Sequence, residues 1–255
     1  MNSETIGLVV FTCVFGGALL GMLIRSWLPA DHVSGDARDV MKLGIGLIAT
    51  TTALVLGLLT ASAKSAFDTE NAEIRTSAAN LVLLDRTLAQ YGPEDAPIRA
   101  GLKQAVARRI GLTWPASSDT PVKLDSAELQ HGAEMIEQSI RMLQPTTEIQ
   151  KVLQAKAIAL TSDLLKSRWL VMGQAAGSTI PVPFLVVVVF WLSVIFACFA
   201  MLAPPNRTLA AVLGLSALSV AAAVFLILEM DHPFSGLIRV SDQPLRYALS
   251  QIGGS

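Results

Sequence analysis

Four long stretches of the chain are apolar and carry no charged residue: 6–24, 43–63, 184–203 and 209–228. Each holds about 20 residues, and at 1.5 Å per residue a helix of that length crosses the roughly 30 Å hydrocarbon core of a bilayer. No lysine or arginine precedes the first stretch, which argues against a signal peptide, so we interpret it as an uncleaved span. The pattern predicts a protein with four transmembrane helices.

The spans fall into two pairs. Residues 1–64 contain the first two, and residues 181–230 contain the last two. The short connection Pro204-Pro205-Asn206 favours a tight turn, which predicts an antiparallel hairpin of the third and fourth spans. In the first span, Gly17 and Gly21 lie four residues apart, a spacing that permits close packing of helices in lipid.

Between the second and third spans, residues 65–180 are polar, with apolar residues at helical spacing. Leu43 to Gln90 should form one helix, because an apolar stripe continues past the second span through Phe67, Ile74, Ala78, Leu81 and Leu88. Three further helices are expected at about 94–110, 125–143 and 146–174. The predicted fold is an all-α membrane protein with four transmembrane helices and a helical soluble domain inserted between the second and third.

Residues 231–255 form an amphipathic C-terminal segment that mixes apolar residues with Arg239 and Arg246. Such a segment binds either to the membrane surface or to the helices of the soluble domain. The pattern does not distinguish these two placements, and both stay open at this point.

Composition agrees with a membrane protein, since 52% of the residues are hydrophobic and 15% are charged, against about 25% charged in soluble proteins. The formal net charge of −1 excludes a strongly basic nucleic-acid-binding protein. The two cysteines lie inside apolar stretches, and the three histidines are far apart, so neither a disulfide framework nor a metal site is expected. No nucleophile motif or phosphate-binding loop occurs. We therefore predict no enzymatic activity and no cofactor.

Four spans place both termini and the helical domain on one side of the membrane. Lysines and arginines near the spans are slightly more numerous on that side, which favours the cytoplasm. Arg25, directly after the first span, favours the opposite orientation. We predict a multi-pass protein of the inner (cytoplasmic) membrane with the helical domain and both termini in the cytoplasm.

Two polar residues fall on the apolar stripe that follows the second span, namely Asn71 and Asp85. A buried carboxylate needs a partner, so we expect Asp85 to form a structural ion pair with an arginine such as Arg239 or Arg75. The alternative is a gate latch or an ion site, in which the neighbouring Arg86 would also be a candidate.

A second polar cluster, Glu229, Asp231 and His232, follows the fourth span directly. Ionisable groups in the membrane are candidates for function. At the interface, however, their side chains reach water, so the cluster is either a structural anchor or part of an ion pathway. His232 would titrate near neutral pH in the second case.

Four segments resemble the bestrophin-like family of bacterial membrane proteins: 67–73 (FDTENAE), 84–86 (LDR), 91–94 (YGPE) and 229–238 (EMDHPFSGLI). This family, largely without assigned function, is named for its likeness to bestrophin anion channels. The resemblance implies a homo-oligomeric channel, pentameric as in bestrophins, whose second span lines the axis. His232 stands where a more basic residue is usual in the family.

Two stripes of the second span can face such an axis. One stripe consists of small residues, namely Gly46, Thr50, Ala53, Gly57 and Ala61. The other consists of leucines, namely Leu47, Leu54 and Leu58. Small residues are typical of helix packing, whereas a leucine ring can gate a pore by excluding water. The candidates for lining a pore are Thr50, Leu54, Gly57, Leu58 and Ala61.

Together these features predict an oligomeric channel that passes ions, anions among them, with the lipid bilayer, inorganic ions and copies of itself as partners. The alternative is a non-conducting membrane scaffold or sensor whose helical domain binds a protein partner.

Overall fold

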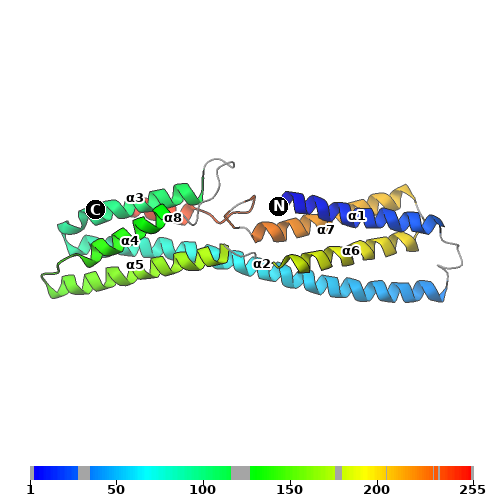
Figure 1. Ribbon diagram of the computed structural model, residues 1–255, viewed down its shortest axis with the longest axis horizontal. Coiled ribbons are helices and arrows are strands. Elements are labelled where there is room, and N and C mark those ends of the chain that lie inside the picture. Colours follow the sequence, from blue (N-terminus) through cyan, green and yellow to red (C-terminus); the bar gives the residue numbers. More distant parts are fainter. Residues whose placement is uncertain are drawn as a thin grey trace. The chain divides into compact units, whose positions relative to one another are not determined.

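The computed structural model describes residues 3–27, 35–115, 127–175, 180–204, 206–231, 233–234 and 236–253. All regular elements within these ranges are helices, which confirms the predicted all-α class (Figure 1). The chain divides into two compact units. Unit 1 consists of Met1–Ala66 and Ser178–Asp231, and unit 2 consists of Phe67–Gly177 and His232–Ser255.

Unit 1 contains the four apolar helices. These are α1 (Ser3–Trp27), the first part of α2 (Asp36–Tyr91), α6 (Val182–Leu202) and α7 (Arg207–Met230). All four are long and apolar enough to cross a membrane. Helices α1 and α7 extend beyond their uncharged stretches at both ends, where polar residues such as Glu4, Arg25 and Arg207 continue the helix.

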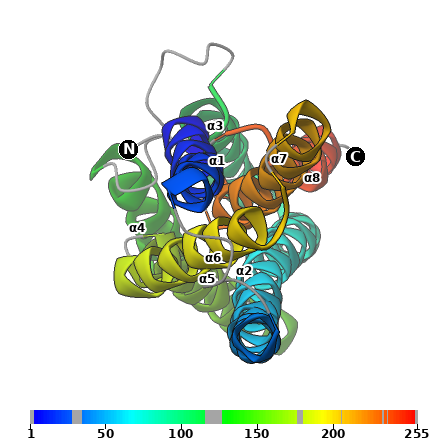
Figure 2. The same cartoon turned by 90° about the vertical axis from the view of Figure 1, so that its right-hand side faces the viewer.

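Helix α1 packs against both α6 and α7, and an end view shows these three helices grouped with α2 at the edge (Figure 2). The crossing of α1 and α6 is close. A Cβ atom on Gly17 would lie 2.7 Å from the carbonyl oxygen of Ser193, and one on Gly21 would clash with the carbonyl oxygen of Ala197. The two glycines therefore let the α1 backbone approach α6 closely, as their spacing indicated.

Helix α2 runs without interruption from Asp36 to Tyr91, so the expected continuation of the second span into a polar helix is correct. It contains no proline, and the hydroxyls of Thr50, Thr51 and Thr60 each donate to a carbonyl four residues earlier, which keeps them satisfied within the helix. Gly92 ends it with φ 142°, a conformation open mainly to glycine.

Unit 2 consists of the second part of α2, the short 3₁₀ helix η2 (Pro93–Asp95), α3 (Ala96–Thr113), α4 (Ala127–Arg141), α5 (Glu148–Ala175) and α8 (Gln243–Gln251). The three inserted helices lie within three residues of the ranges expected from the sequence, and Asp125 lies outside the described residues.

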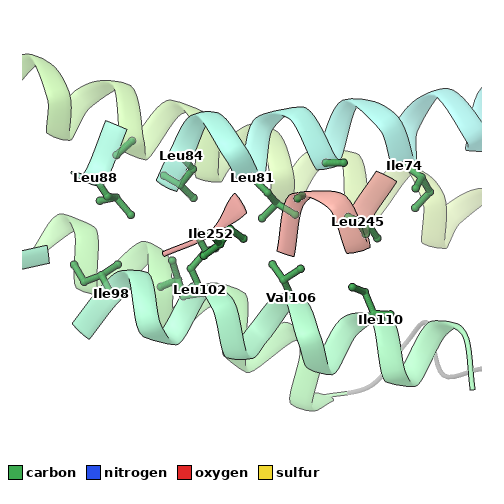
Figure 3. Packing of buried hydrophobic residues seen from close by; sticks show 14 of the residues in the cluster. Ile74, Leu81, Leu84, Leu88, Ile98, Leu102, Val106, Ile110, Leu245 and Ile252 are labelled. Atoms are coloured by element: carbon green, nitrogen blue, oxygen red, sulfur yellow. The ribbon is translucent and has the colours of Figure 1, made fainter. Parts of the chain in front are cut away.

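The core of unit 2 joins α2, α3 and α8. Apolar residues of α2 and α3 face one another, with α8 between them (Figure 3). Leu245 and Ile252, from α8 and its end, are fully buried in this core. The C-terminal segment therefore packs on the soluble helices, which decides between the two placements left open by the sequence.

The close crossing of α1 and α6 yields a test. Gly21→Ala should destabilise the protein by about 1–3 kcal/mol, because a methyl group there meets the Ala197 carbonyl and must push the helices apart. Gly16→Ala is the matched control, since a Cβ on Gly16 has no atom within 4 Å. Thermal unfolding of both variants in detergent measures the difference. Equal melting temperatures for the two variants would contradict the close crossing.

Candidate functional site

The first part of α2 has one packed face and one open face. Ile45, Thr52 and Ala63 are buried against the apolar core of unit 1. On the opposite face Leu54 and Leu58 are 64% and 63% exposed. The other three pore-lining candidates, Thr50, Gly57 and Ala61, are exposed as well. All five candidates thus lie on the side of α2 that no other described residue of unit 1 buries.

The glycines of this open face differ from those of α1. A Cβ atom on Gly46 or Gly57 would meet nothing within 4 Å, whereas Gly17 and Gly21 lie directly against α6. The small residues of α2 therefore do not serve helix packing within this chain. No ionisable residue occurs on α2 between Lys42 and Lys64, so the face is uncharged.

Asp85 is the central polar residue of unit 2. Its side chain is 1% exposed and pairs with Arg99 of α3. The guanidinium donates from Nε to Oδ1 at 2.8 Å and from Nη2 to Oδ2 at 3.1 Å, and the backbone N–H of Gly253 donates to Oδ2 at 3.4 Å. The carboxylate of Asp85 therefore links α2, which carries it, to α3 and to the end of α8.

The expected partners Arg239 and Arg75 were wrong. Arg239 is exposed and donates to the carbonyl of Gly236 at 2.6 Å, and Arg75 is exposed on α2. A stripe on one helix shows that Asp85 faces the core, but it does not show which helix lies opposite. A usable signal was present: Asp85 and Arg99 stand at equal distances before and after Gly92, where the chain reverses.

Sequence reasoning missed Asp95, one turn before Arg99. This carboxyl is buried, and its Oδ2 atom has no hydrogen-bond partner among the described residues. Burial raises the pKa of Asp95, Arg99 lowers it by a smaller amount, and the charges of Asp85 and Glu94 raise it further. Arg99 thus faces two carboxyl groups, of which Asp85 holds it by hydrogen bonds.

The second part of α2 also makes a polar contact with α5. The hydroxyl of Ser167 donates to Oε2 of Glu73 at 2.6 Å, and the hydroxyls of Ser77 and Ser167 are 3.1 Å apart. Since Ser167 uses its only proton on Glu73, Ser77 donates to Ser167. Serines on polar helices gave no signal for this buried chain of hydrogen bonds.

The remaining predicted residues are dispersed. Asn71 is half-buried and Arg86 is exposed, both on α2. Glu229 is buried near the end of α7, and the half-buried Asp231 follows that helix, its backbone N–H bonded to the carbonyl of Ile227. His232 lies outside the described residues. Among the described residues, no group of three or more His, Cys, Asp or Glu side chains is arranged to hold a metal ion.

Comparison with known proteins adds to this geometry. The family model for the Bestrophin-like domain matches residues 12–245, most of the chain. The protein belongs to the Bestrophin-like family. The resemblance inferred from the sequence is thereby confirmed, and the four apolar helices are those of a multi-pass membrane protein.

A solved structure supports this family's fold. The chain is similar to a mutant of a bacterial bestrophin homolog from Klebsiella pneumoniae, with a TM-score of 0.67 over 97% of this chain and 99% of that one. The sequence identity is 12%, so the likeness shows a common fold. A comparison with curated protein sequences gives no match.

The buried carboxyl of this bestrophin-like protein yields a pH prediction. Because the pKa of Asp95 is higher in the folded than in the unfolded chain, its ionised form opposes folding. The penalty is absent below about pH 4, where both states are protonated, and grows as the pH rises. Asp95→Asn should therefore raise the melting temperature at pH 7 to 8, and the gain should vanish near pH 4.

Asp85→Asn is the matched control and should lower the melting temperature at pH 7, because it weakens the pair with Arg99. Melting curves from pH 4 to pH 8 compare both variants with the parent. A gain for Asp95→Asn that does not change with pH would contradict the raised pKa.

Proposed function

We propose that this protein is a homo-oligomeric channel that passes ions, anions among them, through an axis lined by α2. The observation that carries the proposal is the uncharged, open face of α2, where two leucines are more than 60% exposed and two glycines have no neighbour. Four helices from one chain cannot enclose a wide aqueous pore. Several copies are therefore required, and the bestrophin comparison favours five.

Packing in unit 1 supports α2 as the helix nearest the axis. Helix α1 packs against both α6 and α7, and α2 joins this group by one side (Figure 2). Its other side is free to meet copies of itself. Gly46, Gly57 and the small residues between them would allow such copies to approach one another closely.

Leu54 and Leu58 would form the narrowest part of this pore. A leucine ring at a constriction disfavours a continuous column of water, so it closes the pore without any charged gate. No acidic residue occurs on α2 between Asp39 and Asp68, which supports anion passage because no carboxylate would repel the ion.

The alternative function is a non-conducting scaffold or sensor in the membrane, whose soluble helices bind a protein partner. Exposed apolar residues on and between α4 and α5 favour it, namely Met135, Met142, Ile149 and Val152. Conduction by the purified protein distinguishes the two functions.

We further propose that the protein lies in the inner membrane with unit 2 and both termini in the cytoplasm. In a background without Cys13 and Cys198, cysteines at Ser3, Ser139 and Ser250 should react with an impermeant thiol reagent only from the cytoplasmic side. A cysteine at Arg207, the first residue of α7, should react only from outside. Labelling of Ser139→Cys and Arg207→Cys from the same side would contradict four spans.

The channel itself is tested by widening the constriction. Leu54→Ser and Leu58→Ser should each raise the single-channel conductance severalfold in planar bilayers, because a hydroxyl keeps the constriction wet. Leu215→Ser is the matched control, since Leu215 is 68% exposed but lies on α7. Its conductance should equal that of the parent. If neither the parent nor any variant carries current over a wide range of voltage and pH, the scaffold function replaces the channel.

A further inference from the structure

Arg25 occupies an inward position at the end of the first membrane span. It lies one turn after Gly21 and two turns after Gly17, on the face of α1 that packs against α6. Its side chain is half-buried, although the neighbouring side chains of Ile24 and Ser26 are exposed. Arg25 therefore continues the packed face of α1 with a charged side chain.

The register between α1 and α6 shows what Arg25 faces. A Cβ atom on Gly17 would meet the carbonyl oxygen of Ser193, and one on Gly21 would meet that of Ala197. The two helices thus run parallel and advance together by four residues. One turn further on, Arg25 is level with the last turn of α6, which ends at residue 202.

A second arginine reaches the same end of α6 from α2. Arg38 donates from Nη2 to the carbonyl oxygen of Leu202, the last residue of α6, at 2.8 Å. The last carbonyls of a helix have no partner within it and carry a partial negative charge of about half an elementary charge. One guanidinium group is enough to offset that charge, so Arg38 caps α6.

The two guanidinium groups have more donors than this one carbonyl can use, since each carries five N–H bonds. In the described ranges of the chain, no hydrogen bond or ion pair reaches Arg25. Its Nη1 atom and the Nε atom of Arg38 are buried without an acceptor from the described residues. A half-buried cation with unused donors is unfavourable until an acceptor joins it.

These arginines lie at the border of the membrane. Arg25 is the first charged residue after the uncharged stretch 6–24, and the uncharged stretch of α6 ends at residue 203, close to the same level. Trp27, which ends α1, is 84% exposed. Exposed tryptophans at the ends of spans are typical of the head-group layer. The acceptors that surround this position in a bilayer are the phosphates of phospholipids.

We propose that the end of α6 binds the head group of an anionic phospholipid, whose phosphate accepts hydrogen bonds from Arg25 and Arg38. A guanidinium matches two phosphate oxygens with two parallel N–H donors, which fixes the head group as well as attracting it. The acyl chains would lie along Leu23 and Ile24, which are 55% and 42% exposed on α1. A free phosphate can use the same donors but lacks this apolar contact.

The site depends on the spans and not on the pore, so its test needs no conduction. Full-length protein in detergent is titrated with phosphatidylglycerol, phosphatidylcholine, diacylglycerol and glycerol 3-phosphate, and native mass spectrometry counts the bound molecules. Phosphatidylglycerol should bind saturably at one site per chain. Phosphatidylcholine should bind severalfold more weakly, because its ammonium group opposes the arginines. Diacylglycerol lacks the phosphate and glycerol 3-phosphate lacks the acyl chains, so both should bind at least tenfold more weakly.

Variants locate the lipid. Arg25→Gln and Arg38→Gln should each weaken phosphatidylglycerol binding about tenfold, because charge-assisted hydrogen bonds are lost. Arg25→Lys keeps the charge but not the planar fork, so its affinity should be intermediate. Lys42→Gln is the matched control one turn along α2. It removes the same charge, but Lys42 is exposed and paired with Asp39, so this variant should bind as the parent does.

Circular dichroism checks that each variant keeps its helices, and if Arg25→Gln does not, unchanged affinity of Arg25→Lys counts against the proposal in its place. The proposal is overturned if any of the three other compounds binds as tightly as phosphatidylglycerol, or if both glutamine variants keep the affinity of the parent. It is overturned as well if Lys42→Gln loses as much affinity as they do, because the lipid would then respond only to the charge of the surface.

Discussion

Helix α2 meets two environments along one continuous hydrogen-bonded backbone. In hydrocarbon a backbone must satisfy its own N–H and C=O groups, which a helix does without help from side chains. The first part of α2 can therefore leave one face uncharged and open, while the second part carries Asp85 and a stripe of leucines into a soluble core. Helices α1, α6 and α7 form a core with the first part of α2, and α3 and α8 form a core with its second part.

The pair of Asp85 with Arg99 governs how the soluble core closes. Removing two charges from water is unfavourable, so the pair adds less to stability than its short distances suggest. Its geometry is demanding, however, because both carboxylate oxygens are occupied and one also accepts the N–H of Gly253. A misplaced α3 or α8 would leave the carboxylate buried without these donors. The pair thus selects one arrangement of three helices.

Much of the fold could be predicted because its signals are local. Uncharged stretches identify the spans, the continuing apolar stripe predicts an unbroken α2, and Gly17 with Gly21 marks a close helix crossing. Contacts between segments that are distant in the sequence were harder to predict. Asp85 was predicted to be buried, yet its partner depended on the reversal of the chain at Gly92. Asp95 could be recognised as a buried carboxyl only from the structure, which places it beside Arg99.

The cavity between the helices of unit 2, which Arg109 and Arg168 help to line, could not be predicted from the sequence. The two arginines lie far apart along the chain, and arginines on polar helices ordinarily face water. The C-terminal segment remained ambiguous for a different reason, because an amphipathic helix satisfies its apolar side equally well on a membrane surface or in a core. In the candidate pore, periodicity identified the open face of α2. It did not show which stripe lines the axis, because the small-residue and leucine stripes adjoin and both are exposed in a single chain.

The placement of α8 also has a consequence for biosynthesis. Unit 2 takes its core from the insert between α2 and α6 and from α8, which follows the last span. During translation the inserted helices are made before α6, α7 and α8. The part of their apolar surface that α8 covers therefore stays unburied until α8 has been made. Completion of the soluble core therefore follows the synthesis of all four apolar helices. A chain arrested before α8 would lack Leu245, Ala248 and Ile252, and the apolar residues that these cover on α2 and α3 would stay exposed.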